Sequence, residues 1–272
     1  VLTQPTFPEE EIQREVEKIL AAIQSAEDQP DEVAGKEFQK TLFLNSPYGH
    51  PVEGTKESIP RITQEAIVRF YRSYYHPNNA ILTIVGDISA DEVKTRLLPG
   101  LATWPMAEIP KIPFKPSFAK EQKTVKIDRG ITQANIIIGH AGVSRDNPDY
   151  YALIIMNYIL GGGGFSSRLT EEIRNKRGLA YSVASFFDTG KYPGSFQIAL
   201  QTKNSSAREA IALSLQEVER IRKELISEKE LDGAKKYLIG SFPMRLNTQG
   251  KLTGFLTQVE YFGLGLDYPE KY

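Results

Sequence analysis

The order of hydrophobic patterns in the second half of this 272-residue chain constrains its fold most. Residues 132–142 and 194–202 are strand-like, and 194–202 alternates apolar with polar side chains, as a strand with one wet face requires. Apolar residues at helical spacing predict a helix over 147–160 and two more over 211–225 and 227–238. This order predicts an α+β fold, with helices packed on one face of a mostly antiparallel sheet.

The first half contains two further helical patterns. Residues 7–30 form an amphipathic pattern with acidic side chains in the first turn, and a second helix is predicted to end before Pro77. The apolar run 80–87 is typical of a buried strand, and a short helix is predicted over 89–98.

A proline-rich stretch with little periodicity predicts an extended linker over residues 104–120. It divides the chain into a first domain over 1–103 and a second over 121–272. The chain opens on Val1, without a start methionine, and stops where another helix is approached. We therefore expect a fragment of a longer protein, with the second domain truncated at its C-terminus.

The composition restricts the classes of partner. Hydrophobic residues make up 40% of the chain, charged residues 25%, and the net charge is -1. Acidic and basic residues mix along nearly every segment, whereas a nucleic-acid binder would gather Lys and Arg on one face. No stretch approaches the run of about 18 apolar residues of a membrane-spanning helix. Because the chain has no cysteine, disulfides, thiolate zinc sites and cysteine nucleophiles are excluded.

Residues 161–183, "GGGGFSSRLTEEIRNKRGLAYSV", place four glycines before a charged helical segment. A phosphate cradle would need the spacing G-x-x-x-x-G-K-[ST], but Phe165 follows the glycines and no lysine stands at the required place. The run could instead form a flexible link between helices, or leave room for the backbone of a bound peptide. The residues that follow favour the peptide.

Two of these residues are Arg174 and Tyr181. Arg174 lies near the end of the predicted helix, Gly178 is placed to end that helix, and Tyr181 opens the next strand. A helix, a tight turn and a strand bring guanidinium and phenol to the same edge, where both can donate to a carbonyl oxygen that gains negative charge. In the alternative interpretation, Arg174 pairs with Glu171 or another surface acid and Tyr181 belongs to the core.

This segment, together with residues 46–89 and with "SEKELDGAKKYLIGSF" over 227–242, resembles the insulinase/pitrilysin family of zinc peptidases, which includes mitochondrial processing peptidase. The resemblance covers nearly the whole chain and implies two similar α+β domains joined by a linker. The family's second domain supplies an Arg and a Tyr that hold and polarise the substrate, and these match Arg174 and Tyr181. In the non-zinc subunit of processing peptidases a similar loop touches substrate, and it matches Gly161, Gly162, Gly163, Gly164 and Phe165.

The zinc site of that family is not matched. Active members hold zinc with His-x-x-Glu-His and a later Glu, but His50, His76 and His140 have no ligand spacing and are interpreted as structural. By the resemblance, the later Glu falls seven residues after the position of Glu15, where this chain has Ala22. We therefore predict that this chain binds no zinc, and that zinc is held by a partner subunit or by a segment upstream of residue 1.

Three functions remain open at this point. The first is a non-zinc subunit that supplies Arg174 and Tyr181 to a homologous zinc-bearing partner, with a peptide or unfolded polypeptide as substrate. The second is a complete zinc peptidase whose metal motif precedes Val1, and the third is a scaffold subunit without enzymatic function. In this resemblance residues 1–103 are the C-terminal part of the zinc-type domain, and the periplasm of a bacterium is the expected location.

Overall fold

The structure is a computed structural model that describes residues 2–44, 46–111 and 114–272. Its chain forms two compact units, the first made of Val1–Gln24, Glu53–Phe114 and Ser241–Tyr272 and the second of Ser25–Val52 and Lys115–Gly240. The chain passes from the first unit to the second between Phe114 and Lys115, within the predicted linker. The predicted domain ranges on either side of that linker stay predictions.

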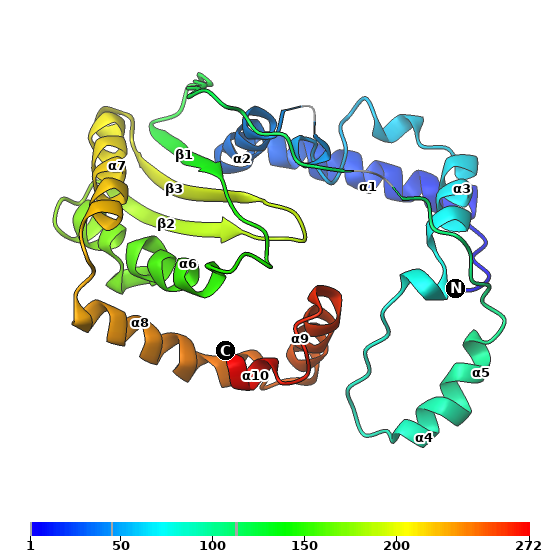
Figure 1. The fold of residues 1–272 in the computed structure, drawn as a ribbon. Helices are drawn as coiled ribbons and strands as arrows, with labels where there is room; N and C mark the ends of the chain where they lie inside the picture. The colour runs from blue at the N-terminus through cyan, green and yellow to red at the C-terminus, as the bar shows by residue number, and fades with distance from the viewer. Residues whose placement is uncertain (1, 45, 112–113) are drawn as a thin grey trace. The chain divides into compact units, whose positions relative to one another are not determined.

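The second unit contains a three-stranded antiparallel sheet (Figure 1). Its strands are β1 (Gln133–Ala141), β2 (Ala180–Asp188) and β3 (Ser195–Lys203), with β3 in the centre. Ile136 pairs with Leu200 across the β1–β3 ladder, so the apolar side chains of the two strands point to the same face. The predicted α+β class with an antiparallel sheet is confirmed.

Helical segments cover this apolar face of the sheet. They include α6 (Tyr150–Asn157), α7 (Ala207–Lys223) and the turns between them. Their buried side chains join those of the strands in one core, made of Leu160, Leu169, Ile173, Ala180, Val183, Phe196, Ile198, Leu200 and Ala210. The apolar side chains that alternate along the strands and those that recur at helical spacing therefore pack together in this core.

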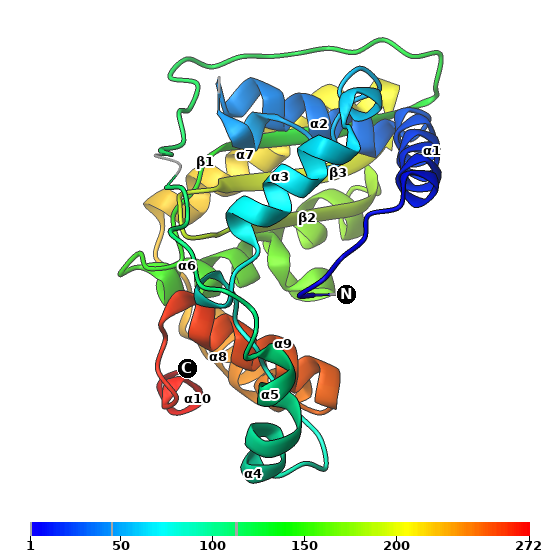
Figure 2. The same ribbon diagram turned by 90° about the vertical axis from the view of Figure 1, so that its right-hand side faces the viewer.

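Helix α2 (Pro30–Leu42) packs against the β1 edge of the sheet (Figure 2). The ring of Phe38 lies so close to Gly139 that a Cβ added there would be 2.7 Å from Cζ of Phe38. Gly139 thus lets the helix approach the strand.

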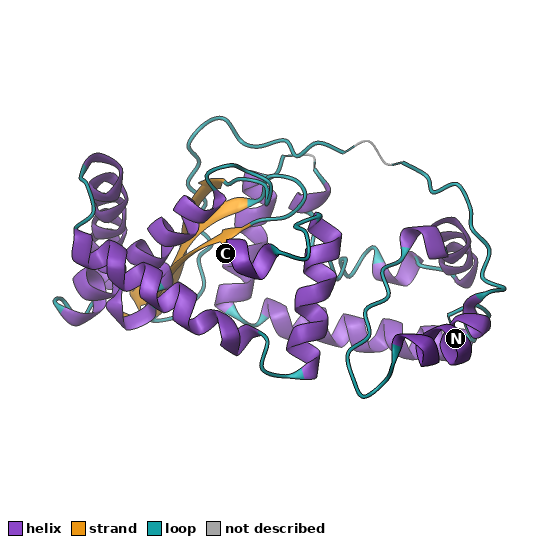
Figure 3. Ribbon diagram, turned by 60° about the horizontal axis from the view of Figure 1, so that its bottom comes forward, coloured by secondary structure: helices purple, strands orange, loops and turns teal. Residues whose placement is uncertain are grey.

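Helices make up most of the remaining structure, and the strands gather in one sheet (Figure 3). The other α-helices are α1 (Glu9–Glu27), α3 (Gln64–Tyr74), α4 (Ala90–Glu92), α5 (Leu98–Leu101), α8 (Glu228–Ser241), α9 (Gln249–Phe262) and α10 (Tyr268–Lys271). Ser227 and Glu230 form the predicted capping box before α8. Within the described ranges, no helix combines the length and the apolar character needed to cross a membrane.

The buried strand predicted over residues 80–87 is wrong. Residues 80–85 belong to no strand, and Ile81 and Leu82 are exposed by 44% and 58%. A strand needs a neighbouring strand to pair its backbone N–H and C=O groups, and none lies beside this segment in the described part of the chain. An apolar run therefore does not by itself predict a strand at these residues.

Candidate functional site

The glycine-rich segment lies between two π-helical turns. After α6 the chain forms the turn Tyr158–Gly162, then a 3-10 turn over Gly164–Ser166, and then a second π-helical turn over Thr170–Asn175. π-Helical turns are rare and frequently occur at functional sites. The segment predicted as a helix is therefore helical, but with an uncommon geometry on both sides of the loop.

Internal packing explains three of the four glycines. Gly161 is buried, and a Cβ added there would lie 2.5 Å from Oγ and 2.6 Å from the backbone N of Ser185 on β2. For the next two glycines the added Cβ would meet Nδ2 of Asn157 and the carbonyl oxygen of Tyr158, each at 2.6 Å. Gly164 differs, because open space surrounds it and its φ of 58° is the left-handed conformation that favours glycine.

The turn after the loop is fixed in the core. Ser167 Oγ donates to the carbonyl oxygen of Gly164 at 2.8 Å and lies 3.0 Å from Oγ1 of Thr170. Leu169 and Ile173 are fully buried in the same turn. These contacts set the direction in which Arg174 leaves the turn.

Arg174 lies between two exposed aromatic rings. Its Cζ is 4.7 Å from the ring centroid of Phe165 and 5.1 Å from that of Tyr181. The two rings are exposed by 73% and 81%, while Arg174 is half-buried. Such cation–π contacts hold a guanidinium at a ring face without using its N–H donors. The structure thus brings together Phe165, Arg174 and Tyr181, and their role in binding stays a prediction.

A shift in the register of strand β2 accompanies this arrangement. Ala180 pairs with Thr202, and Ser182 pairs with the next residue of β3, so Tyr181 is the extra residue. Such a bulge redirects a side chain out of the regular alternation of a strand. Tyr181 therefore stands at the surface next to Arg174.

The alternative interpretation of this pair is wrong. Glu171 accepts a hydrogen bond from Nδ2 of Asn175 at 2.8 Å, and in the described part of the chain no ion pair involves Arg174. Tyr181 is a surface residue, as its exposure shows. The guanidinium N–H groups of Arg174 are therefore available to a ligand.

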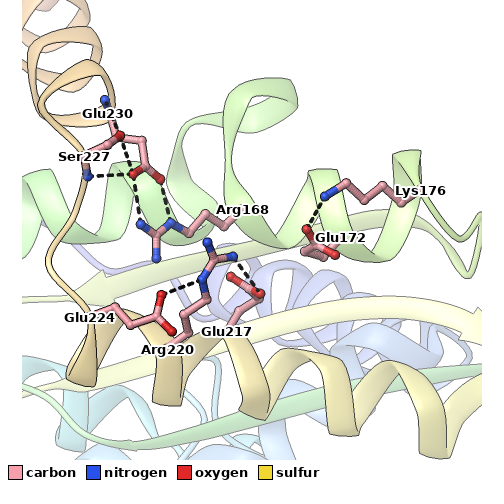
Figure 4. Close-up of polar contacts among 8 residues, drawn as sticks. All are labelled: Arg168, Glu172, Lys176, Glu217, Arg220, Glu224, Ser227 and Glu230. Atoms are coloured by element: carbon pink, nitrogen blue, oxygen red, sulfur yellow. Dashed lines mark hydrogen bonds and ion pairs between the residues drawn. The ribbon is translucent and has the colours of Figure 1, made fainter.

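A second arginine of the segment, Arg168, uses Nε and Nη2 of its guanidinium for hydrogen bonds to Glu230 (Figure 4). Its Nε donates to Oε1 of Glu230 at 2.6 Å and its Nη2 to Oε2 at 3.0 Å. The hydrogen bonds from Arg168, followed by those from the backbone and hydroxyl of Ser227, lower the pKa of Glu230 to about 2. Sequence reasoning found the Ser227–Glu230 cap but missed Arg168, which lies 62 positions before Glu230.

The three histidines lie in different surroundings, and their structural role stays a prediction for His50 and His140. His76 is buried, with its ring nitrogens 2.9 Å from the carbonyl oxygen of Pro105 and 2.8 Å from that of Arg72. His140 is exposed, and its Nδ1 lies 2.7 Å from the carbonyl oxygen of the next residue, while His50 is exposed at the end of a 3-10 turn. Ala22 lies on the exposed side of α1, and among the described residues no three His, Asp or Glu side chains form a metal-holding group.

Fold and site together define a class of protein. It is a mixed α+β domain with a small antiparallel sheet and an exposed Arg–Tyr pair, and in the residues described no metal-holding group is found. Residues 61–238 match the family described as the peptidase M16 inactive domain, and the chain belongs to this family. The resemblance to the insulinase-type peptidases is thereby confirmed.

Curated relatives and a solved structure extend this match. A Helicobacter pylori protein named non-peptidase homolog YmxG is 31% identical over 98% of this chain and 61% of its own length. An uncharacterized zinc protease of Streptomyces coelicolor is 29% identical over 93% of this chain and 56% of its own. The crystal structure of a peptidase M16 inactive domain from Pseudomonas fluorescens superimposes with a TM-score of 0.90 at 31% identity, covering 99% of this chain and 64% of that one. The chain therefore spans about three-fifths of the length of these relatives.

The glycines at 161 and 164 are predicted to respond oppositely to side-chain size. At Gly161, Ala should lower the free energy of unfolding by about 1–3 kcal/mol because its Cβ clashes with β2, and Asn should cost more. At Gly164, Ala should cost about 1–2 kcal/mol through its positive φ, and Asn should cost less because it tolerates that conformation. Urea unfolding of the four variants measures this, and the same order at both positions would contradict the packing described.

The Arg168–Glu230 pair is predicted to lose its contribution in acid. Because the pKa of Glu230 is lowered to about 2, its charge stabilises the fold above the ordinary pKa of 4.5, and this contribution disappears as the pH falls through 2. Glu230→Gln keeps the capping geometry, so it should cost about 1–2 kcal/mol at pH 6 after allowance for solvent screening. The difference in unfolding free energy between wild type and variant should shrink between pH 4.5 and pH 2. A difference that does not vary with pH would show that Glu230 carries no such charge effect.

Proposed function

We propose that this chain is a non-zinc member of the peptidase M16 family that binds peptide through Arg174 and Tyr181 and works beside a homologous zinc-bearing subunit. The observation that carries the proposal is the half-buried guanidinium of Arg174, which has two aromatic neighbours and no ion pair in the described chain. An arginine held in this way keeps its planar set of donors for a bound group.

The chemistry that this pair can perform is donation to a substrate carbonyl. Both the guanidinium and the phenol are hydrogen-bond donors, and both face solvent at one edge of the sheet. Donors aimed at an oxygen stabilise it most when it gains negative charge during attack on an amide. Gly164 and Phe165, at the exposed end of the loop, would contact the same peptide, and the substrate-binding role of Gly161, Gly162 and Gly163 belongs to the proposal as well.

The residues that the structure describes form no group that fits a zinc ion. Ala22 occupies the position expected for a carboxylate ligand, and neither an alanine nor the isolated histidines can replace it. Zinc on another subunit would supply the activated water that hydrolysis of an amide needs. The part of this chain is then to bind and orient the peptide.

The relatives support two of the functions. The name of the Helicobacter pylori relative, a non-peptidase homolog, favours a subunit without zinc. The name of the Streptomyces coelicolor relative, an uncharacterized zinc protease, favours the second candidate, a complete zinc peptidase with its metal motif before residue 1. The third candidate, a scaffold subunit, is favoured less. Such a subunit would have no use for the guanidinium of Arg174, which has no ion pair among the described residues. The periplasm of a bacterium remains the proposed location, and it rests on the family resemblance alone.

Removal of single donors should lower turnover. In the full-length protein with its zinc-bearing partner, Tyr181→Phe deletes one directed donor and should reduce turnover of a peptide by about 100-fold. Arg174→Lys keeps the charge but loses the planar fork, so it should also reduce turnover. Melting temperatures should change little, because Tyr181 is exposed.

Tyr237→Phe is the matched control for this experiment. Tyr237 is an exposed tyrosine of the same unit that stacks on Tyr158, at 4.8 Å between ring centroids. Its variant should keep wild-type turnover. Full turnover in both Tyr181→Phe and Arg174→Lys would reject the proposed role and favour the scaffold function.

Zinc content separates the first candidate from the second. We expect the purified full-length protein to hold no stoichiometric zinc after dialysis, because Ala22 cannot coordinate it. Metal analysis by mass spectrometry measures this, with a chelator-treated sample as the baseline. One tightly held zinc per chain would instead support a complete peptidase.

A further inference from the structure

We propose that Arg168 is a positioning residue for the peptide-binding group: by clamping the segment 165–174 to helix α8 through Glu230, it holds Arg174 between Phe165 and Tyr181. The inference rests on the proposed function for its consequence in catalysis. Its structural part concerns only this chain and can be tested without a substrate.

The position of Arg168 in the segment is the first argument. Arg168 follows Phe165 by three residues and precedes Arg174 by six, so it lies between the two members of the stack that come from this segment. On the side of Phe165, the loop is tied to the residues just before Arg168, because the carbonyl oxygens of Gly163 and Gly164 accept hydrogen bonds from Ser166 and Ser167. A fixed point directly after the loop therefore decides where the exposed ring of Phe165 stands.

The geometry of the clamp is the second argument. The Arg168 side chain is exposed by only 10%, and it meets both oxygens of Glu230 in a fork-to-fork contact. Glu230 Oε2 also accepts hydrogen bonds from the backbone N and from Oγ of Ser227, at 3.0 Å and 2.8 Å. The first residues of α8 thus hold the carboxylate of Glu230 independently of Arg168. This fixes the position of the carboxylate to which Arg168 donates.

The energetics of the clamp are the third argument. Nη1 of Arg168 is buried without a partner, and so is Oε2 of Glu217 on α7. A largely buried charge pair often contributes no more stability than apolar side chains of the same volume, and an unsatisfied buried donor lowers stability. Stability alone is therefore a weak reason for this arrangement, whereas a bidentate pair fixes direction as well as distance.

Figure 4 shows the surroundings of the clamp. Arg168 reaches toward Ser227 and Glu230, and the ion pairs of Arg220 with Glu217 and Glu224 lie beside it. The Arg168–Glu230 pair joins the segment that carries Arg174 to the beginning of α8. Helix α8 is 14 residues long, so the segment is attached to the first turn of a regular helix.

The side-chain NMR signal of Arg174 tests the clamp directly. Ring currents of Phe165 and Tyr181 shift its Nε–H resonance, which Arg174→Lys identifies by its disappearance. In the full-length protein we expect Arg168→Gln and Glu230→Gln to move this resonance toward its position in Phe165→Ala. Arg168→Lys, which keeps the charge but loses the fork, should give an intermediate position and remains informative if Arg168→Gln does not fold.

Two controls separate positioning from general loosening. Arg222→Gln breaks an exposed ion pair with Glu219 on α7, and Leu213→Ala removes apolar packing at the edge of the core. Neither should move the Arg174 resonance at a temperature where the variant is folded. An unmoved resonance in Arg168→Gln, or an equal movement in Leu213→Ala, would overturn the proposal.

Turnover with the zinc-bearing partner supplies the second readout. A misplacement of about 1 Å can cost about 100-fold in rate, so Arg168→Gln should approach the loss expected for the direct donors. If the resonance moves while Tyr181→Phe keeps full turnover, the clamp is supported and the proposed function fails. The experiment thus tests the clamp and the proposed function separately.

Discussion

The close approach of the glycine-rich segment to strand β2 is the constraint on which the site depends. Gly161 packs against the backbone of Ser185, and Leu169 and Ile173 then anchor the following turn in the core. A side chain at residue 161 would push the segment away from the sheet. Because the segment and β2 are in contact, Arg174 from one and Tyr181 from the other meet at the surface.

The arrangement separates structural from functional residues by burial and pairing. On either side of the turn that carries Arg174, Arg168 is nearly buried and pairs with Glu230, and Arg177 pairs with Glu172. Among the described residues no ion pair involves Arg174, and its guanidinium lies instead near the rings of Phe165 and Tyr181, which are mostly exposed. Large exposed aromatic rings add little to the stability of a fold, since they bury little surface, and they are enriched where proteins bind ligands. This contrast is the basis on which we propose Phe165, Arg174 and Tyr181 as a binding surface.

Sequence reasoning reached the fold class and the Arg174–Tyr181 pair because both depend on local patterns. Alternating strands, helical spacing and a turn glycine at Gly178, whose φ is 62°, are properties of neighbouring residues. It failed at residues 80–87, where strand formation depends on a partner strand rather than on apolar content. It also missed the contact between Arg168 and Glu230, because no local signal marks partners 62 positions apart.

The central claim is that Arg174 and Tyr181 donate to the backbone of a bound peptide. The most direct measurement follows the Nε–H resonance of Arg174 while an unlabelled peptide is added to the full-length protein with its zinc-bearing partner held inactive. A guanidinium that donates to a carbonyl oxygen loses solvent and gains a directed hydrogen bond, so the account predicts a saturable downfield shift of this resonance, absent in the exposed arginine Arg222 on α7. A peptide that binds the complex at saturation and leaves the Arg174 resonance unchanged would contradict it.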